Sequence, residues 1–227
     1  FDQTVIAMLA EKIRTSFELS DSQLGFVLGP ASVIAFVFVG IPLARLVDIF
    51  PRKYVLSASI AVLGTITALG GLAQNFVQFV GTRLFVGASS AANGPGSYSL
   101  LVDYFRPLKI PLIFALVQLG FILGSAAGTW GGGRLIAWTE TWSETSHFFG
   151  LTIFNWQWIL IMIGLPGLLA SLFFLMVREP PRRSPPESSR LVPRDAPFWR
   201  KAVAFTGFDA LRAINMRGAA YWPLFAA

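Results

Sequence analysis

The sequence predicts an all-α, polytopic membrane protein, because its apolar stretches are long and its charged residues are few. Of the 227 residues, 54% are hydrophobic and 13% are charged, about half the charged fraction of a typical soluble domain. A helix needs roughly 20 apolar residues to cross the core of a bilayer. Five stretches of 20 to 28 residues meet this length, and they are 25–47, 54–73, 77–104, 111–138 and 156–177.

The loops between these spans alternate in charge, which orients the chain in the membrane. Eleven Lys and Arg residues lie in three loops, and the three loops that alternate with them hold none. The basic loops are 50–53, 105–110 and 178–201, and the loops without Lys or Arg are 16–24, 74–76 and 139–155. Lys12 and Arg14, just before the first of the latter, are the exceptions. Because positive residues are retained in the cytoplasm, we expect a multi-pass protein of an inner or plasma membrane with its basic loops inside.

Composition and charge exclude several other classes of protein. The net charge of +6 arises mostly in loops on one face, where it suits anionic lipid better than nucleic acid. The chain has no cysteine, and its one histidine, His147, lies in an external loop. We therefore predict no metal site and no cofactor. The expected partner is the lipid bilayer rather than nucleic acid, and the oligomeric state is left unassigned.

The first helix and its exit loop come before the five long stretches. Residues 1–10 are apolar from the start, and we interpret them as the outer part of a first span that ends near Ile13. In the loop that follows, Ser20 or Asp21 is placed to cap the next helix through a side-chain oxygen.

The fourth span, 77–104, is expected to be interrupted. Pro95 has no backbone N–H, so the carbonyl of Ala91 loses its usual helical partner, and a kink or break follows. Within a bilayer such a break is tolerated only where protein or a water-filled cavity satisfies the freed groups. We therefore expect the fourth span to border a cavity.

The fifth span carries a glycine at every fourth position, which predicts a smooth strip along one helix face. A neighbouring helix can approach such a strip closely. The strip favours either static helix packing or a sliding contact between moving parts, and the sequence leaves both open. Its members are Gly120, Gly124, Gly128 and Gly132.

Ionisable residues inside spans are costly, so each suggests a function until it is explained. Asp2 and Arg83 lie well inside different helices, and we predict that they pair, as a proton-coupling site or as a permanent structural ion pair. Asp209 and Arg212 are three residues apart and share a helix face, although their segment can also be partly interfacial. Arg134, near the outer end of its span, is expected to reach the interface.

The chain divides into three parts. Residues 1–177 are predicted to form an N-terminal six-helix transmembrane domain with a truncated first helix. Residues 178–198 are rich in proline, serine and arginine and are predicted to form a cytoplasmic linker. Residues 199–227 are expected to begin a C-terminal transmembrane domain with a seventh helix. We therefore expect a fragment of a longer protein, with about six and a half spans present.

Several motifs, taken in their order and spacing, resemble the major facilitator superfamily. The loop between the second and third spans reads Gly40-x7-Asp48-Ile49-Phe50-Pro51-Arg52-Lys53, similar to the superfamily signature GxLaDRxGRR. Arg83-x3-Gly87 resembles the arginine motif of its fourth span. The spinster-like branch is the best match for Phe1-Asp2, Asn155-Trp156-Gln157-Trp158, Gly164-Leu165-Pro166-Gly167 and Arg178-Glu179-Pro180.

The resemblance implies the major facilitator fold, in which twelve helices form two halves and substrate binds between them. Alternating access then comes from rocking of the halves. The Asp of the signature, here Asp48, acts in this family as a gate across the interface between the halves. Arg52 and Lys53 would assist it there, or alternatively serve only to fix the topology.

The sequence departs from the family pattern at the gate and at the coupling site. A Gly, an Arg and a Gly of the signature are replaced by Ala44, Ile49 and Pro51. Spinster-like proteins carry a Glu seven residues after the span-four Arg, and Ser90 stands there in this chain. Proton coupling would therefore be absent, rest on Asp2 or Asp209, or work in a different way.

We predict a secondary active transporter, not an enzyme, for an organic, amphipathic or lysolipid-like solute, with protons as a coupling ion. Arg83 would hold an anionic group, Asp2 would titrate, and Ser90, Asn93 and Gln118 would supply polar contacts. The alternatives are an uncoupled facilitator and a non-transporting membrane sensor. An enzyme is disfavoured because no span holds a His, a Cys, closely spaced carboxylates or a cluster of metal ligands.

Overall fold

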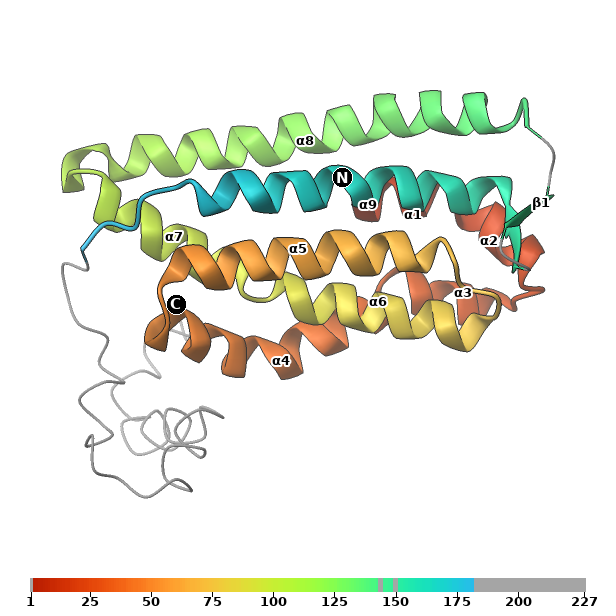
Figure 1. Ribbon diagram of the computed structural model, residues 1–227, viewed down its shortest axis with the longest axis horizontal. Helices are drawn as coiled ribbons and strands as arrows, with labels where there is room; N and C mark the ends of the chain where they lie inside the picture. The colour runs from red at the N-terminus through yellow and green to blue at the C-terminus, as the bar shows by residue number, and fades with distance from the viewer. Residues whose placement is uncertain (1, 143–144, 149–150, 182–227) are drawn as a thin grey trace, which may run out of the picture.

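The computed structural model describes residues 2–142, 145–148 and 151–181. Its long helices lie side by side in one bundle, with a short antiparallel hairpin at one end (Figure 1). In chain order the elements are α1 (Asp2–Met8), α2 (Ala10–Ser16), α3 (Asp21–Leu28), α4 (Pro30–Ile49), α5 (Arg52–Gly70), α6 (Phe76–Ser90), α7 (Asn93–Tyr104), the 3-10 turn η1 (Pro107–Lys109), α8 (Ile110–Thr139), β1 (Thr145–Phe148), β2 (Leu151–Phe154) and α9 (Asn155–Leu175).

The predicted all-α membrane class is confirmed. Among the described residues, four helical stretches are long and apolar enough to cross a bilayer: Asp21–Gly40, Arg52–Gly70, Pro107–Thr139 and Asn155–Leu175. The α4–α5 loop, the start of α8 and the segment that leaves α9 gather at one end of the bundle, and the hairpin lies at the other (Figure 1). This is the threading that the alternating basic loops predicted.

The interrupted fourth span lies where the proline predicted it. α6 ends at Ser90 and α7 begins at Asn93, two residues before Pro95. The second span is also divided, at Gly29, which the sequence reasoning missed when it treated 25–47 as one helix. Pro30 is the first residue of α4, where its missing N–H costs nothing.

The predicted cap at the start of α3 is also formed. The Ser20 hydroxyl accepts a hydrogen bond from the Gln23 N–H at 3.3 Å, and the Gln23 side chain accepts one from the Ser20 N–H at 3.0 Å. This reciprocal pair satisfies two donors that the helix start would otherwise leave free. Of the two candidates, Ser20 is therefore the cap, and Asp21 is the first residue of the helix.

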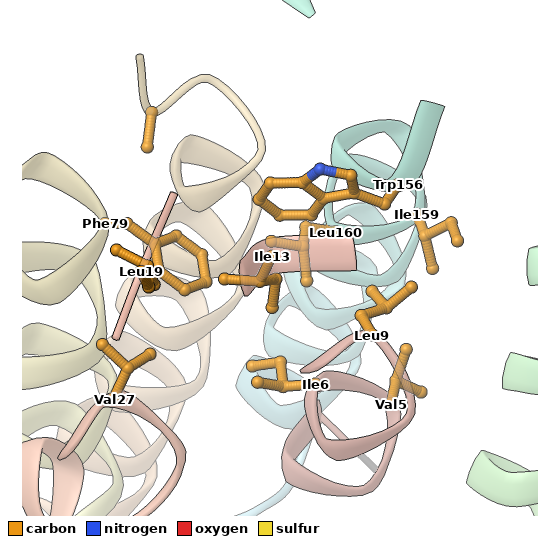
Figure 2. Close-up of a cluster of buried hydrophobic side chains, with 11 residues drawn as sticks. Val5, Ile6, Leu9, Ile13, Leu19, Val27, Phe79, Trp156, Ile159 and Leu160 are labelled. Carbon is orange, nitrogen blue, oxygen red and sulfur yellow. The ribbon is translucent and has the colours of Figure 1, made fainter. Parts of the chain in front are cut away.

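A hydrophobic core near the hairpin end fixes the first helices against the rest of the bundle (Figure 2). Phe79 of α6 and Trp156 of α9 meet edge to face with ring centroids 5.8 Å apart, a favourable arrangement for aromatic rings. The indole N–H of Trp156 donates to the Ser16 hydroxyl at 2.9 Å. Leu9 and Ile13 are fully buried in the same cluster, so α1 and α2 are held beside α6.

The predicted glycine strip of α8 has a neighbour along its second half. Gly128 and Gly132 are buried, and a Cβ at Gly132 would lie 2.9 Å from a methyl group of Val5 in α1. Beside Gly120 and Gly124 the space within 4 Å is open among the described residues. The closer approach of backbones is elsewhere, between α5 and α9, where Gly64 faces Gly164.

Candidate functional site

Arg83 and Asp2 meet inside the bundle, as the sequence predicted. The Arg83 Nη1 donates to the Asp2 Oδ2 at 3.2 Å, and the two side chains are 3% and 15% exposed. The guanidinium carbon also lies 5.2 Å from the centre of the Phe79 ring. Because the aromatic core holds α1 beside α6, it places the carboxylate opposite the guanidinium.

The ion pair leaves much of its hydrogen-bonding capacity unused. Arg83 Nε, Arg83 Nη2 and Asp2 Oδ1 are buried and have no hydrogen-bond partner among the described residues. Buried charged groups are costly when they are not fully hydrogen-bonded. These three atoms therefore leave the pair able to hydrogen-bond to a group that the described residues do not supply.

Two glycines make room for Arg83 and bring its helix close to a neighbour. A Cβ at Gly70 of α5 would lie 2.8 Å from Arg83 Nη2, so the guanidinium fills the space of the missing side chain. A Cβ at Gly87 would overlap the backbone of Ser32 in α4. The Ser32 hydroxyl in turn accepts a hydrogen bond from the Gln3 amide at 3.4 Å, which extends the polar contacts next to Asp2 along α1.

Ser90 and Asn93 lie at the break in the fourth span, and both are engaged within the bundle. The Ser90 hydroxyl donates to the Gly87 carbonyl at 2.8 Å. The Asn93 Oδ1 accepts from the Ser59 hydroxyl of α5 at 3.0 Å, and Ser59 also bonds to the Ser89 carbonyl. These contacts tie the broken segment to α5.

The remaining candidates within the spans do not join this cluster. Gln118 is exposed on α8. Asp209 and Arg212 lie outside the described residues, as does the whole segment expected to begin the seventh helix. The guanidinium of Arg134 lies 5.0 Å from the Trp130 ring.

A second buried ion pair lies at the basic end of the bundle. The Arg52 Nη1 contacts the Asp103 carboxylate at 2.5 Å and donates to the Ser99 carbonyl at 2.8 Å. Lys53 places its ammonium 4.8 Å from the centre of the Tyr54 ring. The side chain of Asp48, the third predicted gating residue, lies outside the described part of the structure. Arg52 therefore binds within its own half of the fold.

Glu179 closes this cluster from the segment that follows α9. Its two carboxylate oxygens accept the backbone N–H groups of Arg52 and Lys53 at 2.8 and 3.0 Å. A carboxylate at a helix N-terminus satisfies free donors and complements the helix dipole. The Tyr104 hydroxyl donates to the neighbouring Arg178 carbonyl. The start of the linker is thus bound to the ends of α5 and α7.

Asp103 and Glu179 were missed as site residues by the sequence reasoning. Both lie at the ends of spans, where charged residues are ordinary and attract no attention. Glu179 belongs to the Arg178-Glu179-Pro180 motif, which was noted without a role. An acidic residue within the basic segment 178–201 was the available signal for Glu179, and only the fold shows which groups it contacts.

Replacing Glu179 with alanine is expected to free the start of α5. The loss of two acceptors at a helix N-terminus should lower the free energy of unfolding by about 1–2 kcal/mol. Hydrogen exchange in the full-length protein should accelerate at the amides of Arg52 and Lys53. As a control, Glu140→Ala removes an exposed carboxylate paired with Lys12 and should leave these amides unchanged. Unchanged exchange in Glu179→Ala would contradict the capping role.

The described residues contain no group of three or more His, Cys, Asp or Glu side chains that could hold a metal ion. The candidate site thus consists of two buried ion pairs in one helical bundle. One joins α1 to α6 in the interior, and the other joins α5 to α7 at the basic end.

Comparison with known proteins shows the family. The model of the Major Facilitator Superfamily matches residues 1–227. An "MFS-type efflux pump" of Mycolicibacterium smegmatis is 29% identical over 87% of this chain and 42% of the relative. "Protein spinster" of Drosophila melanogaster is 22% identical over 80% of this chain and 27% of the relative. The chain therefore spans less than half the length of these relatives.

The fold has a solved counterpart. The inward-facing, unoccupied structure of a bacterial homolog of the human lysosomal transporter Spinster aligns with a TM-score of 0.65 and 24% identity, over 95% of this chain and 46% of that one. The bundle thus has the fold of the matching part of that structure, and the predicted likeness to spinster proteins agrees with the Drosophila relative. The chain belongs to the major facilitator superfamily.

Proposed function

We propose that the chain forms one half of a secondary active transporter that moves an organic, amphipathic solute by alternating access. Membership of the major facilitator superfamily and a bundle of apolar helices long enough to cross a membrane support this proposal. The observation that carries it is the half-satisfied ion pair between Asp2 and Arg83, because a span that buries a charge pair with unused donors and an unused acceptor has little to gain from it structurally. A lysolipid-like solute suits the polar pair and the many apolar side chains around it.

Proton coupling would run through Asp2. Its Oδ1 has no partner, and the carboxylate is less completely buried than the guanidinium it contacts. A carboxylate next to a fixed arginine changes its protonation when the local access to water changes. Ser90 carries no titratable group, so within the described part of the site Asp2 is the carboxylate suited to this role.

Gating would involve the basic end of the bundle. Asp48, Arg52 and Lys53 belong to the degenerate signature, and Arg52 is held by Asp103. In this proposal Arg52 fixes the start of α5, and the gate of the signature acts next to it.

The first experiment measures proton flux into liposomes that contain the full-length protein. Lysolipids and amphipathic drugs are added under an imposed pH gradient. Asp2→Asn should abolish substrate-dependent proton movement, which is measured per amount of folded protein because the change also leaves Arg83 without its anion. Asp21→Asn, which alters an exposed carboxylate paired with Arg14, is the matched control and should behave as the wild type. Coupled transport that survives in Asp2→Asn would contradict the titration role.

An uncoupled facilitator is the second candidate, and Ser90 favours it. Ser90 stands at the position of the family's glutamate. Its hydroxyl donates to the Gly87 carbonyl of the same helix, and it has no carboxylate to bind and release a proton. Substrate movement that is insensitive to the pH gradient would select this candidate. No movement of any solute would favour a sensor built on the same fold.

A further inference from the structure

Thr67 of α5 carries a buried hydroxyl that has no hydrogen-bond partner among the described residues. The residue is only 1% exposed, and a buried hydroxyl without a partner lowers stability. The other buried Ser and Thr residues of the described chain all have bonded hydroxyls, and they are Ser32, Ser57, Ser59, Ser89, Thr139 and Ser171. Thr67 is the exception among them.

The position of Thr67 on α5 places it beside the guanidinium of Arg83. Gly70 is three residues further along the helix, and a Cβ there would lie 2.8 Å from Arg83 Nη2. Residues three apart on a helix have Cβ positions about 5–6 Å from each other, so Thr67 and the guanidinium occupy adjacent places. Gly64 and Gly71, on the other side of Thr67, pack against α9. Thr67 therefore faces the interior between α6 and α9.

The guanidinium next to Thr67 has donors to spare. Arg83 Nη1 holds the Asp2 carboxylate at 3.2 Å, while Arg83 Nε and Nη2 have no partner among the described residues. Thr67 Oγ1 is an acceptor that is not bonded to them. A small movement of the long Arg83 side chain can therefore form a bond that the present arrangement leaves unmade.

The other ionisable residues of the surrounding helices lie toward the two ends of the bundle. α1 has only Asp2, α6 has only Arg83, and α9 has none. Those at the basic end are Arg45 and Asp48 of α4 and Arg52, Lys53 and Tyr54 of α5. Those toward the hairpin end are Glu11, Lys12 and Arg14 of α2, Asp21 of α3 and Arg134 of α8. Within the described residues, Asp2 is thus the titratable group that contacts Arg83.

We propose that Thr67 is a positioning residue, whose hydroxyl binds the Arg83 guanidinium when Asp2 takes up a proton. The inference rests on the proposed function in one respect, namely that Asp2 titrates. While Asp2 is charged, its attraction holds the guanidinium, and Thr67 stays unpaired. A neutral Asp2 still offers an oxygen, but it no longer attracts the cation by charge, and a buried cation then needs further acceptors. Thr67 supplies one, so its hydroxyl is unsatisfied in one protonation state and bonded in the other.

Unfolding of the full-length protein in detergent tests the proposal without a transport assay. Thr67→Val keeps the shape of the side chain and removes the hydroxyl, and Asp2→Asn stands in for the protonated carboxylate. In the wild-type background, Thr67→Val should leave the unfolding equilibrium constant unchanged or lower it, because an unsatisfied group is removed. In the Asp2→Asn background it should raise that constant by about tenfold or more, because a hydrogen bond to a charged group is lost. Thr67→Ser, which keeps a hydroxyl, should have the same effect in both backgrounds.

Thr139→Val is the matched control for this cycle of variants. Thr139 is also fully buried, but its hydroxyl donates to the Ile136 carbonyl of its own helix at 3.0 Å, so its loss should have the same effect in both backgrounds. An equal effect of Thr67→Val in the two backgrounds would overturn the proposal. A dependence on background in Thr82→Val instead would also overturn it, because Thr82 lies beside Gly70 as well and would then be the partner of Arg83.

The pH dependence of stability gives a second test if Asp2→Asn fails to fold. The stability of Thr67→Val relative to Thr67→Ser should fall as the pH is lowered and Asp2 takes up a proton. The stability of Thr139→Val relative to Thr139→Ser should stay constant over the same range, and a parallel course of the two comparisons would overturn the proposal. A wild type without proton-coupled transport would contradict the proposed function alone, because the Asp2→Asn background still decides the role of Thr67.

Discussion

Replacing Gly164 with leucine is expected to abolish the close packing of α5 against α9. A Cβ at this position would lie 2.5 Å from the Gly64 carbonyl oxygen and 2.6 Å from the Ala68 nitrogen, both in the backbone of α5. Neither atom can move without displacing the helix. Overpacking of this kind costs about 3 kcal/mol, so the melting temperature of the full-length protein should fall sharply, with much of the protein lost as aggregate.

Gly81→Leu provides the control for this change. Gly81 lies in α6 with no described atom within 4 Å of a Cβ, so the same side chain enters open space. Thermal unfolding followed by fluorescence-detected size exclusion would compare the two variants. Equal melting temperatures would show that the α5–α9 contact does not require glycine.

The second large effect is expected from Arg83→Met. This change leaves the Asp2 carboxylate buried without its cation, and breaking a buried pair on one side costs about 3–5 kcal/mol. The double variant Asp2→Asn, Arg83→Met removes both charges and should recover a large part of the lost stability. A double-mutant cycle on the unfolding free energy measures this coupling.

The exposed pair between Lys12 and Glu140 supplies the contrast. Their side chains are 30% and 55% exposed, and an exposed pair contributes at most about 1 kcal/mol. Lys12→Met should therefore change the melting temperature little. If Arg83→Met were no more destabilising than Lys12→Met, the pair between Asp2 and Arg83 would contribute nothing to the free energy of unfolding. A double variant as unstable as Arg83→Met would exclude an energetic coupling between the two residues.

The features that sequence reasoning found have local chemical causes. Pro95 breaks a helix because it lacks an N–H, and Ser20 caps one because its hydroxyl reaches the backbone. Asp2 and Arg83 could be paired in advance because a charge inside a span requires an opposite charge. Each argument needs only the residue and the knowledge that it lies in a membrane.

The features that it missed depend on which helices become neighbours. Gly64 is unremarkable in sequence, Gly164 was noted only as part of a family motif, and the packing of α5 on α9 is what gives both a role. The regular glycines of α8 gave a stronger pattern, yet Gly120 and Gly124 meet no described neighbour. Spans that are apolar on all sides do not show which face meets protein. For the same reason Glu179 could not be assigned to the start of α5, 127 residues away in the chain.

The break in the fourth span divides one crossing of the membrane into two separately fastened segments. α6 is held through Arg83 to Asp2, and α7 is held through Asp103 to Arg52. The joint at Ala91 and Ala92 is held as well, because Ser59 of α5 bonds to the Ser89 carbonyl on one side of it and to Asn93 on the other. The span is therefore fastened at three separate points along its length, one of them at the place where its own helical hydrogen bonds are interrupted.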